Sequence, residues 1–122
     1  MNAKTASPKS VLFDGQSYTT RSLIRQATID ILDHPYEDHD ATAIATGALI
    51  KLAVRRAHGR DAWEHTSRRD SWTEDGTSTR YEITVGLGKP VDGHTSITRL
   101  WVNLHSDEIA AAAAVLTEAG VL

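Results

Sequence analysis

The sequence predicts a small two-layer α+β domain, in which helices pack on one face of an antiparallel sheet. Residues 81–87 and 99–105 alternate apolar and polar side chains, a period typical of strands with one buried face. Three other stretches repeat apolar residues at helical spacing, and a turn signal marks a hairpin near the start. The predicted order is a flexible tail over residues 1–10, then one domain over residues 11–122. This domain contains an N-terminal β-ribbon, two helices, a three-stranded antiparallel meander and a C-terminal helix.

The first predicted elements are the ribbon and a helix. Asp14-Gly15 separates two short apolar or aromatic runs, and glycine tolerates the positive φ that a tight hairpin turn requires. Thr19 or Thr20 can cap a helix that stops before Pro35, because proline disfavours helical geometry at the preceding residue. The apolar stripe of this helix consists of Leu23, Ile24, Ala27 and Ile31. We expect this stripe to face the core.

A second helix follows an acidic connector, residues 33–40. Asp40 or Thr42 can cap this helix, and Gly59 stands where a residue with positive φ would end it. The helix is apolar around much of its circumference, which predicts burial on more than one side. The connector contains six potential metal ligands, namely Asp33, His34, Glu37, Asp38, His39 and Asp40. Their spacing matches neither a calcium loop nor a zinc motif, so we expect a solvated loop without a metal.

The meander is predicted from its last two strands, which alternate most clearly. Residues 63–73 are the expected partner of the strand at 81–87, across a turn at Asp75-Gly76. The register of this partner strand stays open, because a slip of one residue would exchange the faces of Trp63 and Trp72. The expected loop between the two clear strands contains Gly88, Pro90 and Gly93.

The last predicted element is a helix that begins at Ser106, its expected cap, and ends at Gly120. Asp107 and Glu108 complement the positive end of this helix. The core-facing residues at helical spacing are Ile109, Ala112, Ala113 and Leu116. An alanine run at residues 110–114 makes the helix thin, so that another element can approach it closely.

Composition narrows the classes of function. The formal net charge of −3 at pH 7 is too small to indicate general affinity for nucleic acids or anionic membranes. The absence of cysteine excludes disulfides, thiolate zinc sites, iron–sulfur clusters and cysteine nucleophiles. No apolar run approaches the ~20 residues of a membrane helix, and the polar start lacks the apolar region of a signal peptide. We therefore expect a cytoplasmic protein that does not bind membranes.

The polar face of the predicted sheet is the main candidate site. Trp101 lies among Arg99, Asn103 and His105 on the strand face opposite the apolar one. Tryptophan and arginine among polar residues are typical of an interface hot spot, although the tail or the ribbon could also cover Trp101. The strand before it adds Arg80, Glu82 and Thr84 to this face. We therefore predict a non-enzymatic interaction module of the inhibitor or accessory type, such as a phage-encoded modulator, without a cofactor, with a protein partner or a second copy.

Two alternatives remain open. A nucleic-acid-binding regulator could use the basic residues in the middle of the chain, aided by stacking on Trp63 and Trp72. These basic residues are Arg55, Arg56, Arg60, Arg68 and Arg69. A small metal-dependent or acid–base enzyme could use His65 and His105, if the two side chains met across the sheet beside Glu64.

Overall fold

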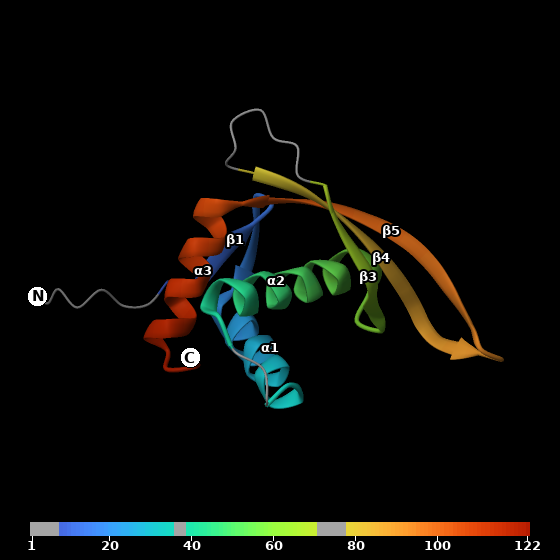
Figure 1. The fold of residues 1–122 in the computed structure, drawn as a ribbon, viewed down its shortest axis with the longest axis horizontal. Coiled ribbons are helices and arrows are strands. Elements are labelled where there is room, and N and C mark those ends of the chain that lie inside the picture. Colours follow the sequence, from blue (N-terminus) through green and yellow to red (C-terminus); the bar gives the residue numbers. More distant parts are fainter. Residues whose placement is uncertain (1–7, 36–38, 71–77) are drawn as a thin grey trace, which may run out of the picture.

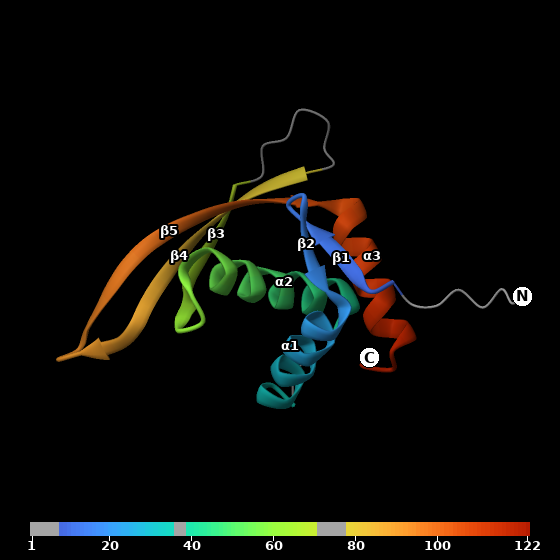
Figure 2. The same ribbon diagram turned by 180° about the vertical axis from the view of Figure 1, so that it is seen from behind.

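Figure 1 shows the computed structural model, which describes residues 8–35, 39–70 and 78–122. Its elements in chain order are β1 (Ser10–Phe13), β2 (Gln16–Thr19), α1 (Thr20–Asp33), α2 (Ala41–His58), β3 (Ala62–Asp70), β4 (Ser78–Val91), β5 (His94–His105) and α3 (Ser106–Glu118). The helices lie on one side of the sheet formed by β3, β4 and β5, and the β1–β2 ribbon lies beside α3 (Figure 2). The predicted α+β architecture is confirmed.

The N-terminal ribbon is the hairpin that the sequence predicts. β1 and β2 pair antiparallel, and Asp14 and Gly15 form its turn with φ angles of 52° and 74°. Val11 and Phe13 on β1 point into the core, whereas Leu12 between them is exposed. The alternation of a strand therefore decides which side of the ribbon packs on the helices.

Side-chain caps fix the starts of the first two helices. The Thr19 hydroxyl accepts a hydrogen bond from the amide of Ser22 at 3.1 Å, and Asp40 accepts one from Ala43 at 3.1 Å. Both residues are among the predicted caps, and Gly59 ends α2 with a φ of 97°. The prediction that Ser106 caps α3 is wrong. β5 continues to His105, so Ser106 already belongs to the helix, and His105 takes the cap position without a side-chain hydrogen bond.

α2 is the central helix of the core, with α1, α3 and β3 packed around it. Its buried residues are Ala45, Ala48, Leu49, Ile50, Ala53 and Val54. These positions cover a wide arc of the helix, which confirms burial on more than one side. All four predicted core residues of α3 are also buried.

The meander has the strand order β3-β4-β5, with both neighbouring pairs antiparallel. The predicted loop around Gly88 and Pro90 is wrong, because β4 runs on to Val91 and pairs there with His94. Asp92 and Gly93 make a tight turn with φ angles of 52° and 77°. Gly88, with a φ of 68°, lies where the register shifts between Leu87 and Val91, so it forms an irregularity within the strand instead of ending it.

The end of the β4–β5 hairpin projects past the helices as a curved arm, which both ribbon views show (Figures 1 and 2). On β3, Trp63 pairs with Gly86, which settles the face of this tryptophan. Trp72 and the predicted Asp75-Gly76 turn lie outside the described residues. The sheet therefore presents one face to the helices and turns the other away from them.

Candidate protein-binding face

The face of the three-stranded sheet that turns away from the helices is called the outer face. Along β4 and β5, alternate side chains point to opposite faces of the sheet, and those on the helix side, such as Ile83 and Val102, are buried. In the register, Arg80 pairs with Asn103 and Glu82 with Trp101. The outer face comprises Trp63 on β3, Arg80, Glu82, Thr84 and Gly86 on β4, and Ile97, Arg99, Trp101 and Asn103 on β5.

Trp101 lies at the centre of a small charged arrangement. The guanidinium carbon of Arg80 lies 4.2 Å from the centroid of the Trp101 ring, a cation–π contact. Glu82, directly opposite Trp101, forms an ion pair with Arg99, with 3.7 Å between Oε1 of Glu82 and Nε of Arg99. At exposed sites a cation–π contact contributes about 0.5–1 kcal/mol and an ion pair about 0–1 kcal/mol. The structure thus brings two of the predicted site residues, Trp101 and Arg99, together with Arg80.

Trp63 is a second aromatic residue of the outer face. Its ring lies directly on Gly86, where an added Cβ atom would stand 2.4 Å from the ring atom Cε2. The Trp63 indole donates a hydrogen bond to the carbonyl of Gly88 at 3.0 Å. Ile97 pairs with Gly86 from the other side and is exposed. Sequence reasoning missed this cluster, although a glycine inside a strand signals a position that another group can cover closely.

Asn103, another predicted site residue, contacts the ribbon. The Asn103 amide donates a long hydrogen bond of 3.4 Å to the carboxylate of Asp14. His105 is half-buried at the end of β5. The ribbon borders a cavity of about 310 Å³ that Trp101 also lines, yet Trp101 stays 38% exposed. The ribbon therefore flanks Trp101 without covering it, and residues 1–7 of the predicted tail lie outside the described residues.

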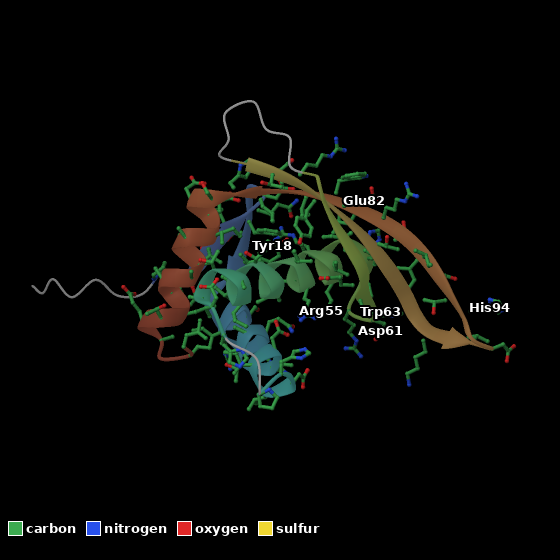
Figure 3. The ribbon with its side chains drawn as sticks, in the orientation of Figure 1. Tyr18, Arg55, Asp61, Trp63, Glu82 and His94 are labelled. Carbon is green, nitrogen blue, oxygen red and sulfur yellow. The ribbon has the colours of Figure 1, made fainter. Side chains whose placement is uncertain are left out.

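The predicted basic region is not gathered into one surface by its described members. Arg55 donates to the buried Gln26 of α1 at 2.5 Å, and Figure 3 shows Arg55 on the helix side of the sheet. Arg56 donates to the carbonyl of Ser17 at 2.7 Å and lies 5.2 Å above the Tyr18 ring. Both arginines thus hold neighbouring elements. Arg60 is exposed, and the side chains of Arg68 and Arg69 lie outside the described part of the chain.

The register separates the two histidines of the enzyme alternative. The backbone of His65 lies between the pairs Glu64–Val85 and Thr66–Thr84, whereas His105 pairs with Ser78. Thr84 and Ser78 are six positions apart on β4, roughly 20 Å at ~3.3 Å per residue. The strands therefore do not bring these two positions together.

Nothing in the described residues forms a metal site. No three His, Cys, Asp or Glu side chains there are grouped so that they could hold an ion. In the acidic connector, Asp40 caps α2, and Glu37 and Asp38 lie outside the residues that the structure describes.

Within the described ranges, no helix is both long and apolar enough to span a membrane. Comparisons with protein-family models, curated proteins and solved structures yield no match. The binding properties of this chain must therefore be inferred from the chemistry of its own surface.

Proposed function

We propose that this chain is a non-enzymatic interaction module that binds a partner protein through the outer face. The observation that supports this proposal is a set of three large apolar side chains exposed on that one face. Their exposed fractions are 37% for Trp63, 54% for Ile97 and 38% for Trp101. Two arginines flank them, and tryptophan and arginine are the residue types most enriched in interface hot spots.

The charge of the outer face indicates the chemistry of the partner. Its described charged residues are Arg80, Arg99 and Glu82, an excess of one positive charge in a chain whose formal net charge is −3. Of the Arg99–Glu82 pair, Arg99 is the more accessible, with 71% of its side chain exposed against 21% for Glu82. We therefore infer a partner with an apolar patch bordered by carboxylates. A different protein is favoured over a second copy, because two copies of this face would bring like-charged arginines together.

The decisive experiment removes one anchor at a time. Trp101→Ala and Arg99→Glu are compared with Leu12→Ala, a control in which an exposed apolar residue is removed from the ribbon. Partners are captured from a lysate, purified and titrated against each variant. We expect Trp101→Ala to weaken the affinity about 30-fold, or about 2 kcal/mol, and Leu12→Ala to leave it unchanged. Arg99→Glu should weaken binding more at low salt than at high salt.

Three outcomes would contradict the proposal. The first is equal affinity of the wild type and Trp101→Ala for every purified partner. The second is a native mass spectrum that shows a bare dimer, lost in Trp101→Ala, which would assign the outer face to a second copy. The third is co-purified nucleic acid, which would favour the alternative regulator. Circular dichroism of each variant shows whether the fold has survived, and Arg99→Glu keeps the test valid if Trp101→Ala unfolds.

A further inference from the structure

A groove of about 660 Å³ lies on the other side of the sheet, between α2, α3 and the strands. Its volume falls in the range of small-molecule binding sites, ~300–1,000 Å³. It is distinct from the outer face, because Tyr81 and Leu104 from the helix-facing side of β4 and β5 line it.

Small residues keep this groove open. Ala43 and Gly47 lie one turn apart on α2, and Ala110 faces them from α3. A Cβ atom added to Gly47 would meet nothing within 4 Å, so space remains where a larger side chain could sit. Glycine inside a helix costs ~0.5–1 kcal/mol relative to alanine, and no close packing at Gly47 offsets this cost.

The described charged residues that line the groove are all acidic. Among the described lining residues, only Asp40 and Glu64 are charged, and the remaining polar groups are backbone groups and the hydroxyls of Thr42, Thr46, Thr79, Tyr81 and Ser106. Asp40 is engaged as the cap of α2. Glu64 on β3 is half-buried, and no described residue forms an ion pair or hydrogen bond with it.

The helix ends near the groove do not reverse this preference. An uncapped helix N-terminus attracts anions, but Asp40 occupies that of α2, and Asp107 and Glu108 lie in the first turn of α3. A bound anion would therefore meet the carboxylates of Asp40 and Glu64, and no described basic side chain of the groove lining would oppose them.

We propose that the groove binds a small organic cation with an apolar body. Its ammonium or guanidinium group would pair with the carboxylate of Glu64, and its apolar body would lie against Ile50, Tyr81 and Leu104. The hydroxyls of the groove can accept further hydrogen bonds from the cation. This site is independent of the outer face and of the partner proposed there.

Three probes that share a phenyl ring and a four-carbon chain test the charge preference by nuclear magnetic resonance titration. 4-Phenylbutylamine is cationic, 4-phenylbutanol is neutral and 4-phenylbutanoate is anionic at neutral pH. We expect the amine to shift the amide signals of Gly47 and Ala110 and to bind about tenfold more tightly than the alcohol, with the anion weakest. Equal binding of amine and anion would overturn the proposal, as would an absence of amide shifts at millimolar amine.

Matched variants locate the binding in the groove. Glu64→Gln should reduce the affinity for the amine to that for the alcohol, because only the charge is removed. Ala110→Leu should fill the groove and abolish binding of both. Ala114→Leu, one turn further along α3 and exposed outside the groove, is the control and should bind as the wild type does. Wild-type affinity in Ala110→Leu would refute the site, and unchanged amine binding in Trp101→Ala would show that the two proposals stand or fall separately.

Discussion

Two hairpins of this molecule have Asp-Gly turns of the same backbone conformation, but their surroundings differ. Asp14 and Gly15 have φ angles of 52° and 74°, and Asp92 and Gly93 have 52° and 77°. The first turn belongs to a short ribbon that is docked on the helices. The second lies at the tip of the β4–β5 arm, where Figure 3 labels His94 at the far end. The Asp-Gly sequence thus determines the local backbone, and nothing local determines whether the turn is anchored.

The anchors of the first hairpin come from distant parts of the chain. The carboxylate of Glu108 on α3 accepts hydrogen bonds from the amides of Asp14 at 2.7 Å and Gly15 at 3.2 Å. Phe13 is fully buried and meets Tyr18 edge-on, with ring centroids 6.4 Å apart. At the second hairpin, Val91 is 70% exposed. The first hairpin is therefore part of the core, whereas the second depends on its own strand pairing.

The largest expected effect is a difference in stability when one apolar side chain of each hairpin is truncated to alanine. Phe13→Ala should destabilise the protein by about 3–5 kcal/mol, because it removes a fully buried aromatic side chain and leaves a cavity. Val91→Ala, the matched change in the arm, should alter stability by no more than about 0.5 kcal/mol. Urea unfolding followed by circular dichroism measures both. Similar losses in the two variants would show that the arm is packed against the rest of the protein in solution.

A smaller effect tests the carboxylate anchor alone. Glu108→Gln should destabilise the protein by about 1–2 kcal/mol, because the charged acceptor of two turn amides becomes neutral. Asp107→Asn is the control, since it removes a neighbouring first-turn charge whose carboxylate accepts a hydrogen bond from the Glu108 amide and not from the turn amides. Amide hydrogen exchange at Asp14 and Gly15 should accelerate in Glu108→Gln only. Equal losses of stability in both variants would show that the effect comes from the interaction of a negative charge with the N-terminus of α3, and not from the bonds to the turn amides.

The smallest effect concerns Tyr18, on β2 of the first hairpin. Burial raises the pKa of its phenol above the ordinary value of 10.0, Arg56 opposes this shift, and Asp14 adds to it. The folded state therefore keeps a proton that the unfolded state loses above about pH 10, so stability falls as the pH rises through the folded pKa. Tyr18→Phe should flatten this alkaline decline, as measured by urea unfolding across that pH range. Parallel declines in both proteins would refute the shift.

Most of the fold could be predicted because its signals are local. The caps Thr19 and Asp40, the turn at Asp14-Gly15 and the apolar stripe of α3 all depend on residues within a few positions of one another. The errors arose where a local signal competed with strand pairing. Gly88 indicates a loop by itself, yet pairing with β5 on both sides of it carries the strand onward.

The sequence by itself determined the turns, the helix caps and the alternation that places Trp101 and Arg99 on one face, because these follow from backbone sterics and side-chain period. Only the tertiary structure decided that Trp63 covers Gly86, that Glu108 holds the first turn, and that small residues on two helices leave a groove. These contacts join residues far apart in the chain. Their geometry depends on strand register and helix packing, which no short stretch of sequence specifies.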